Sequence, residues 1–457
     1  MDHDIERIKL HEVEIVSHRQ ALGEALRKRQ LNRENERGFQ WILFNLKARF
    51  TSTRLVLAGS MVLASLLVVI LAFSLTASPI GQESRALAAR EETRATGFDF
   101  ALFREVAGED TGNVVLSPLS ARIALAMAYN GASDEVTEEM AYVLDFAGMS
   151  LDEVNAMMRG IIDSLLEADA NVQLEMANSI WSDDDECAFL EDFRQRCVQS
   201  YDAEVASVDF DGSEAAGIID AWVNEKTHGK IPEIAGSFDL KYIGAMLINA
   251  LYLKGAWTYQ FDPSLTAPGS FTLADGGVIK LPFMNQTGDY GYYENEDFQA
   301  VSLPYGDGRL SMYVFLPRDG KSLDDFVQSL NRDDWESWMA AFSTREGMIS
   351  LPRFELEYTK DLSVALTSLG MGSAFHGDAF PRMAGVSPFW IDRVVQKTFI
   401  DVNEEGTEAA AATAVGMMTW GGDFEHLFFM EVNRPLFFAI RDNQTGTLLF
   451  MGSIYEP

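Results

Sequence analysis

The sequence predicts an α+β fold for one large domain at residues 97–457. Helical periodicity dominates the first part of this region, and segments with the period of β-strands dominate the later part. Helices and strands do not alternate strictly, as they would in a parallel α/β sheet. No internal repeat and no second linker interrupts the region, so a single domain follows.

The clearest predicted helix begins at Ser117-Pro118. Ser117 supplies a capping hydroxyl, and Pro118 suits the first helical position because no backbone N–H is needed there. Apolar residues recur at helical spacing through residues 119–127, and Asn130-Gly131 ends the helix.

Later segments have the composition and length of β-strands. Residues 248–257 and 310–317 are rich in apolar, β-branched and aromatic side chains. Residues 435–440 and 447–454 flank a turn at residues 442–446, which predicts a hairpin.

The charge of the 457-residue chain is divided unevenly. Residues 1–54 carry 11 Lys and Arg against 8 Asp and Glu, whereas residues 79–457 carry 25 against 61. A domain this acidic repels phosphate backbones and sulfated polysaccharides. We therefore expect neither a nucleic-acid partner nor a heparin-like one.

Residues 55–76 form an uncharged apolar stretch. At about 1.5 Å per residue, a helix of this length spans roughly 33 Å, the thickness of a bilayer core. Lys47, Arg49 and Arg54 precede the stretch, and positive charge favours the cytoplasmic side. The sequence thus predicts a cytoplasmic segment at 1–54, a transmembrane signal-anchor at 55–76, a linker at 77–96 and an extracellular domain at 97–457.

A cleaved signal peptide is the alternative for the apolar stretch. Small residues at Thr76, Ala77 and Ser78 suit a signal peptidase, and cleavage near Ser78 would give a secreted protein. The region before the stretch is much longer than that of ordinary signal peptides, which favours the anchor.

The domain has no arrangement of residues that would support an enzyme. Its histidines are His228, His376 and His426, and it lacks a G-x-S-x-G elbow, a metal-ligand cluster, a P-loop and a dinucleotide fingerprint. We therefore expect no catalytic residue, no metal and no cofactor.

Two cysteines, Cys187 and Cys197, are too few for a disulfide framework. On one helix they would lie about 15 Å apart, beyond the reach of a disulfide. Whether they pair stays open, because Cys187 could lie on a preceding turn.

Six segments follow one another in the order typical of one family. They are NVVLSPLSARIALAMAYNGA (113–132), WVNEKTHGKIPEI (222–234), INALYLKGAWTYQF (248–261), LPRFELEYTKDLSVALTSLGMGSAF (351–375), DVNEEGTEAAAATAV (401–415) and NRPLFFAIRDNQTGTLLFMGSI (433–454). The chain resembles the serpin family of serine protease inhibitors over residues 97–457. The resemblance implies helices packed on a large central β-sheet, two smaller sheets and an exposed reactive loop. It also implies a monomer that traps a target serine protease as a suicide substrate, in a covalent acyl complex.

The segment from Glu404 to Thr413 has the pattern of a strand that inserts into a sheet. Small side chains follow Glu408, and at strand period Thr407 and Thr413 point to one face while Glu408 points to the other. By resemblance this is the hinge of an inhibitory serpin, and it contains no proline. The hinge residues are Glu404, Glu405, Gly406, Thr407, Glu408, Ala409, Ala410, Ala411 and Ala412. Such a hinge favours an inhibitor over the alternative, a non-inhibitory serpin acting as a binding protein or chaperone.

The resemblance also assigns residues around the opening sheet. Ser117, Ser120 and Asn249 are placed at the shutter beneath it, and Lys254 and Trp257 near the breach at its top. Gln396 stands where many serpins have a shutter histidine, so the pH sensitivity of an imidazole should be absent.

Counting from Glu404 by the usual loop length predicts cleavage between Trp420 and Gly421. Counting back from Asn433 reaches Phe424 instead. Both counts select a large apolar residue, which suits a chymotrypsin-like protease, and Thr419 suits an elastase-like one. No Lys or Arg lies between residues 397 and 434, which argues against trypsin-like and thrombin-like targets.

Overall fold

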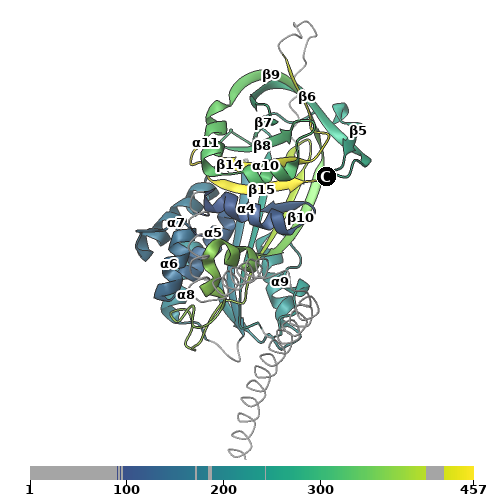
Figure 1. Ribbon diagram of the computed structural model, residues 1–457. Helices are drawn as coiled ribbons and strands as arrows, with labels where there is room; N and C mark the ends of the chain where they lie inside the picture. The colour runs from purple at the N-terminus through teal and green to yellow at the C-terminus, as the bar shows by residue number, and fades with distance from the viewer. Residues whose placement is uncertain are drawn as a thin grey trace, which may run out of the picture. The chain divides into compact units, whose positions relative to one another are not determined.

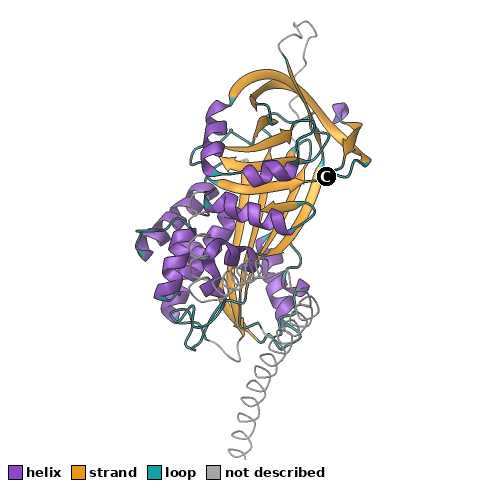
Figure 2. Ribbon diagram, viewed as in Figure 1, coloured by secondary structure: helices purple, strands orange, loops and turns teal. Residues whose placement is uncertain are grey.

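Two β-sheets and a group of helices build the described part of the chain (Figure 1). The computed structural model describes Arg90, Thr93 and residues 96–169, 172–183, 188–241, 243–407 and 427–457, all within the unit Gln82–Pro457. Figure 2 shows most helices gathered along one side of the long strands.

Serine hydroxyls begin four of the helices. Ser117, Ser133, Ser150 and Ser322 each accept a hydrogen bond from a first-turn amide, which satisfies a donor that the helix leaves free. The helices are α4 (Phe98–Glu109), α5 (Pro118–Tyr129), α6 (Asp134–Val143), α7 (Leu151–Leu166), α8 (Glu191–Tyr201), α9 (Ala215–Lys226), α10 (Leu323–Ser329), α11 (Arg332–Ala341) and α12 (Ser363–Leu366), with short turns η1 (Ala235–Ser237), η2 (Pro263–Leu265), η3 (Thr367–Met371) and η4 (Gly372–Phe375).

The central sheet has six strands in the order β10-β11-β12-β4-β2-β3. It is mixed, because β4 pairs antiparallel with β2 but parallel with β11. Its strands are β2 (Val172–Asp183), β3 (Glu204–Val208), β4 (Ala245–Ala256), β10 (Phe354–Asp361), β11 (Arg393–Val402) and β12 (Gly406–Thr407).

The second sheet has nine strands in the order β1-β15-β14-β8-β7-β6-β9-β13, with β5 also paired to β6. Its strands are β1 (Val114–Leu116), β5 (Ala267–Thr272), β6 (Val278–Glu294), β7 (Phe298–Pro304), β8 (Leu310–Pro317), β9 (Ser343–Pro352), β13 (Phe428–Glu431), β14 (Leu436–Asp442) and β15 (Leu448–Ile454).

The nine-stranded sheet corrects one expectation. Two smaller sheets were expected beside the central one, but hydrogen bonding joins them. The cause is the 17-residue strand β6, which pairs with β5 at its start and with β7 at its end, while β9 runs alongside.

Helices cover the central sheet on both faces. On one face the almost wholly buried helix α5 packs against Leu247 and Leu251 of β4 within the main core. On the other face α9 contributes Ile219 and Val223 to a smaller core with Ile248 of β4. Because side chains alternate along a strand, odd-numbered residues of β4 face α5.

The structure confirms the elements predicted from local patterns. The helix capped by Ser117 is α5, the strand expected at residues 310–317 is β8, and the expected hairpin is β14 and β15. These segments carry their own start signals and periodicity, which explains why the sequence alone was sufficient.

The predicted membrane localisation is contradicted. Among the described residues no helix is long and apolar enough to cross a membrane. The stretch 55–76 lies outside the described residues, as do the predicted cytoplasmic segment, most of the linker and Ser78.

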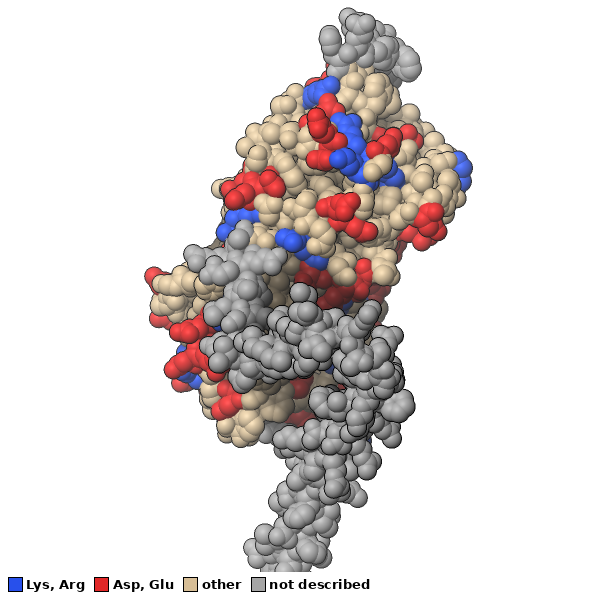
Figure 3. All heavy atoms as spheres, in the orientation of Figure 1, with Lys and Arg blue, Asp and Glu red and all other residues tan. Residues whose placement is uncertain are grey.

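Acidic side chains are spread over the visible face, with fewer basic ones among them (Figure 3). Several basic residues form ion pairs, for example Arg159 with Asp163 and Arg318 with Glu294. Among the described residues Cys197 is a buried free thiol, and burial raises its pKa to about 12, whereas Cys187 lies outside them.

Candidate functional site

A buried polar network lies where α5 meets β4 and β11. Ser117, Ser120, Asn249 and Gln396 are each at most 1% exposed. The Asn249 Oδ1 atom accepts hydrogen bonds from the Ser120 hydroxyl and, at 3.3 Å, from Gln396 Nε2. One amide oxygen thus joins a helix and two strands, and the structure brings together all four residues assigned to the shutter.

Gln396 satisfies both backbone groups of Ser117. The Ser117 amide donates to Gln396 Oε1 at 2.8 Å, and Gln396 Nε2 donates to the Ser117 carbonyl at 2.9 Å. A carboxamide supplies an acceptor and a donor side by side and does not titrate near neutral pH. The contact is therefore independent of pH in the range where an imidazole would change charge.

Asn178 is a member of this network that the sequence analysis missed. It lies directly opposite Asn249 on β2 and accepts a hydrogen bond from Asn249 Nδ2 at 2.6 Å. No local pattern marks Asn178, because its role comes from the pairing of β2 with β4.

Strands β4 and β11 are closed against each other along most of their length. Their parallel pairing runs from Arg393 opposite Met246 to Phe399 opposite Tyr252, and Gln396 lies opposite Asn249. The polar network therefore lies directly beneath this seam.

At the upper end of the seam the hinge residues lie between the two strands. In β12, Thr407 pairs antiparallel with Gly255 of β4 and with Val402 of β11. Gly406 has φ 152°, and a Cβ atom there would lie 2.0 Å from the Gly255 carbonyl oxygen. Only glycine fits this position.

Thr407 contacts an aromatic pair under the top of the sheet. The buried Tyr305 hydroxyl lies 2.7 Å from the Thr407 hydroxyl, and the Tyr305 and Trp257 rings stack at 4.5 Å. Trp257 Nε1 donates to the Asn403 carbonyl at 2.9 Å, and its backbone amide donates to the Glu405 carbonyl at 2.9 Å. Trp257 thus holds the backbone of the hinge on both sides.

Glu404 anchors the start of the hinge through its carboxylate. Arg353 Nε donates to Glu404 Oε1 at 2.8 Å, Arg353 Nη2 also pairs with it, and the Thr266 hydroxyl donates to the same oxygen. Burial of the carboxylate opposes its charge, but the bonds from Arg353 and Thr266 outweigh burial and lower the pKa of Glu404. The charged carboxylate is therefore the form that holds the hinge.

The sequence and fold of this chain have counterparts among known proteins. A sequence profile described as serpin (serine protease inhibitor) matches residues 93–457. This chain belongs to the serpin family.

Several relatives and solved structures resemble this serpin. An uncharacterized serpin-like protein of Thermococcus kodakarensis is 34% identical, over 79% of this chain and 84% of its own. The leukocyte elastase inhibitor of Bos taurus is 32% identical, over 76% of this chain and 93% of its own. The crystal structure of tengpin, a thermophilic serpin in the native state, is 30% identical with a TM-score of 0.73, over 80% of this chain and 93% of tengpin.

Lys254 is assigned to the breach together with Trp257, but its side chain makes fewer contacts than that of Trp257 in this serpin. It lies on β4 opposite Gln173 and is half-buried. No hydrogen bond or ion pair joins its side chain to any residue that the structure describes.

Part of the assigned loop lies outside the described residues of this serpin. The structure does not describe residues 408–426. This segment contains the expected bond between Trp420 and Gly421 and the hinge residues Glu408, Ala409, Ala410, Ala411 and Ala412.

Three further residues of the hinge site in this serpin were not predicted as such. Tyr305 directly follows β7, Arg353 lies between β9 and β10, and Thr266 directly precedes β5. All three contact the hinge. Arg353 lies within the segment LPRF that carries the family resemblance, which was the one available signal.

Proposed function

We propose that this serpin inhibits serine proteases as a suicide substrate. The target protease attacks the loop at residues 408–426, and the loop then inserts between β4 and β11 with the protease still bound as an acyl-enzyme. The observation that carries the proposal is the position of β12, whose Gly406 and Thr407 already lie between these strands.

The pairing of β4 and β11 explains why insertion is favourable. They are parallel neighbours, whereas β12 runs antiparallel to both. Extending β12 would replace one parallel ladder with two antiparallel ladders, and antiparallel pairing is slightly more stable per residue. The backbone of the inserted residues would also gain partners.

The small side chains of the hinge suit this path. Thr407 is fully buried beneath the sheet against Tyr305. The residues after Glu408 up to Thr413 are likewise small, and a large or charged side chain at a face this close to the core would cost several kcal/mol.

For the target we propose a chymotrypsin-like or elastase-like protease. The acyl bond would form at the carbonyl of Trp420, with the amine of Gly421 as the leaving group. Large apolar residues near this bond and the absence of Lys and Arg between residues 397 and 434 support the choice. The bovine relative is named an inhibitor of leukocyte elastase.

In this role the serpin supplies no catalytic group, because the protease provides the nucleophile. The proposed mechanism needs no acid, base or metal ligand from the described part of the chain.

The test is covalent trapping. The full chain is incubated with chymotrypsin, pancreatic elastase and trypsin, and the products are separated on a denaturing gel. We expect a stable complex with chymotrypsin or elastase and none with trypsin. The variant Thr407→Arg should be cut as an ordinary substrate, because an arginine does not fit the buried position against Tyr305 and so keeps the start of the loop from pairing with β4 and β11. Thr407→Ser should trap as the wild type does.

Two outcomes would contradict the proposal. Cleavage of the wild type by all three proteases without any complex would make the protein a substrate only, and a binding or chaperone role would replace inhibition. Complexes of Thr407→Arg at wild-type stoichiometry would show that trapping does not depend on insertion.

A further inference from the structure

Three neighbouring strands form an exposed face where the chain leaves the loop. In β6, β9 and β13 the pairing aligns Thr287, Met348 and Phe429 in one row across the strands. Phe429 is 57% exposed and Met348 is 41% exposed. Because directly paired residues share a face, the two side chains form one apolar spot.

Unpaired acidic residues border this apolar spot. Asp289 and Glu346 lie directly opposite each other, each two residues from the row and so on the same face. Both are exposed, and no described residue forms an ion pair or hydrogen bond with either carboxylate. Like charges in this position are destabilising, and a cationic partner would relieve that repulsion.

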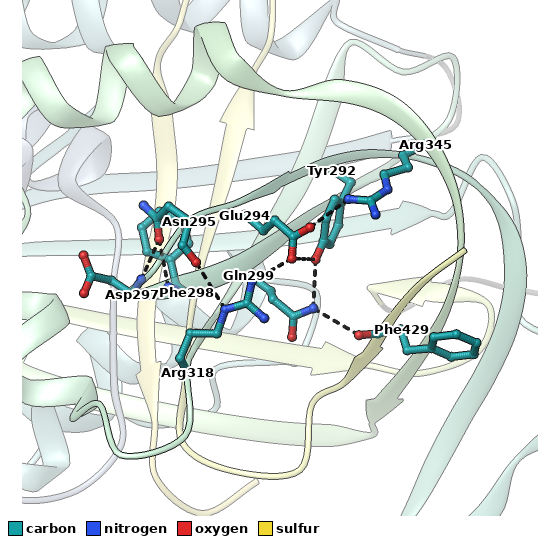
Figure 4. A network of polar contacts seen from close by, with 9 residues as sticks. All are labelled: Tyr292, Glu294, Asn295, Asp297, Phe298, Gln299, Arg318, Arg345 and Phe429. Atoms are coloured by element: carbon teal, nitrogen blue, oxygen red, sulfur yellow. Dashed lines mark hydrogen bonds and ion pairs between the residues drawn. The ribbon is translucent and has the colours of Figure 1, made fainter. Parts of the chain in front are cut away.

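The strand that carries Phe429 is fixed from behind. Gln299 Nε2 donates to the Phe429 carbonyl at 3.0 Å and to the Tyr292 hydroxyl at 2.8 Å, and the Phe428 ring stacks on Tyr292 at 3.9 Å. Figure 4 shows the Phe429 ring pointing away from this network. The backbone that carries the apolar side chain is thus fixed, which lowers the entropic cost of binding.

The ion pairs behind the strand keep basic residues away from the acidic border. Glu294 accepts hydrogen bonds from Arg318 at 2.6 Å and from Arg345 at 2.8 Å, which lowers its pKa. Arg345 also lies over the Tyr292 ring at 5.3 Å. Arg345 is therefore engaged on the opposite face and does not neutralise Asp289 or Glu346.

We propose that this face, defined by Asp289, Glu346, Met348 and Phe429, is a second contact surface for the target serine protease. It fits a protease surface with basic residues around an apolar spot. The proposal rests on the proposed inhibitory function. Strand β13 begins directly after residues 408–426, so a protease engaged on that segment has its own surface next to this face.

The test compares rates of inhibition with the extent of trapping. The association rate constant and the stoichiometry of inhibition are measured for the full chain with α-chymotrypsin and with pancreatic elastase, at about 50 and 300 mM NaCl. The variants are Phe429→Ser and the double variant D289N/E346Q. Matched controls are Val364→Ser, which replaces an apolar residue 64% exposed on α12, and E138Q/E225Q, which removes two exposed acids elsewhere.

We expect D289N/E346Q to lower the rate constant about tenfold at low salt and much less at high salt, because salt screens exposed charges. Phe429→Ser should lower it about tenfold at both salt concentrations. Stoichiometry should stay at the wild-type value in both variants. Phe429→Ser should unfold at the wild-type temperature, and D289N/E346Q at the same temperature or slightly above it, because the like-charge repulsion is removed. The controls should match the wild type.

If the variants and the wild type have equal association rate constants and all form complexes, the proposed second contact surface is wrong. The proposed inhibitory function would still stand. An equal loss in E138Q/E225Q would also overturn the second contact surface, because net charge would then explain the effect. If the wild type forms no covalent complex with either protease, the proposed function fails, and this surface fails with it.

Discussion

Glu404 shows how a single charged residue holds the hinge at the top of the sheet. Its buried carboxylate accepts from Arg353 and Thr266, and the Phe261 amide donates to its backbone carbonyl at 2.9 Å. The next residue, Glu405, bonds to its neighbours through its backbone, and no described residue forms an ion pair with its carboxylate. The pair Glu404 and Glu405 therefore offers a test and its control at adjacent positions.

The variant Glu404→Gln should lower the free energy of unfolding of the intact protein by about 1–2 kcal/mol at pH 7. Glutamine keeps an acceptor for Thr266 but loses the ion pair with Arg353. Because the folded-state pKa of Glu404 is below its ordinary value of 4.5, this stabilisation is present above that value and is lost as the pH falls through the folded-state pKa. Urea unfolding at pH 7 and at about pH 3 measures the difference.

Glu405→Gln is the matched control and should change stability little at either pH. A Glu404→Gln variant as stable as the wild type at pH 7, or one whose deficit persists unchanged at low pH, would show that the charge of Glu404 does not hold the hinge.

Gln396 is a second residue whose side chain joins separate elements. Its carboxamide bonds to both backbone groups of Ser117 and to Asn249. The sequence predicts only that a titrating group is absent at this position. Which groups the amide contacts depends on how α5 lies against β11.

At the scale of strands, β12 sets the register in which the loop would insert. Thr407 lies opposite Gly255 of β4 and Val402 of β11. Each further residue of an inserted antiparallel strand would lie one position earlier along both neighbours. In this register Thr413 would come between Asn249 and Gln396.

Insertion at that level would break the bond from Gln396 Nε2 to Asn249 Oδ1. A hydroxyl both donates and accepts, so Thr413 would replace the lost bond on each side. Without it, Asn249 Oδ1 would keep only its bond from Ser120 and Gln396 Nε2 only its bond to Ser117. Each lost bond would cost about 0.5–1.5 kcal/mol.

Thr413→Val should therefore reduce the thermal stability of the cleaved protein while leaving the intact protein unchanged, and it should raise the stoichiometry of inhibition. Valine has nearly the shape of threonine but no hydroxyl. Thr413→Ser should behave as the wild type. A loss of stability in the intact protein, or the same loss in Thr413→Ser, would contradict this register.

For the whole molecule, the proposed inhibitory mechanism requires a native state that is not the most stable one. The seam between β4 and β11 is closed below β12 in the intact protein, so the gain from insertion is not yet realised. Each backbone bond formed contributes about 0.5–1.5 kcal/mol net, which over a dozen inserted residues is comparable to the stability of an ordinary domain, about 5–15 kcal/mol.

Cleaved protein should consequently unfold on the order of 10–20 °C above intact protein. A metalloprotease that cuts between residues 408 and 426 and forms no acyl-enzyme prepares the cleaved form, and calorimetry at several scan rates compares the two, because such transitions can be irreversible. The Thr407→Arg variant is the control, since its cleavage should bring little gain. An unchanged or lower transition after cleavage would mean that the loop does not insert.

The sequence by itself determined those features of this serpin that local chemistry specifies. Ser117-Pro118 begins α5, and strand periodicity marks β8 and the hairpin of β14 and β15. In each case the signal lies in neighbouring residues, because caps and periodicity act over one or two turns of chain.

Only the tertiary structure decided which distant residues meet. Asn178 opposite Asn249, Arg353 on Glu404 and Asp289 opposite Glu346 are products of strand register and of the packing between sheets. The fusion of the two smaller sheets through β6 is of the same kind. Such contacts join residues far apart in the sequence, and a shift of one residue in register would remove them without changing any local pattern, so no local signal encodes them.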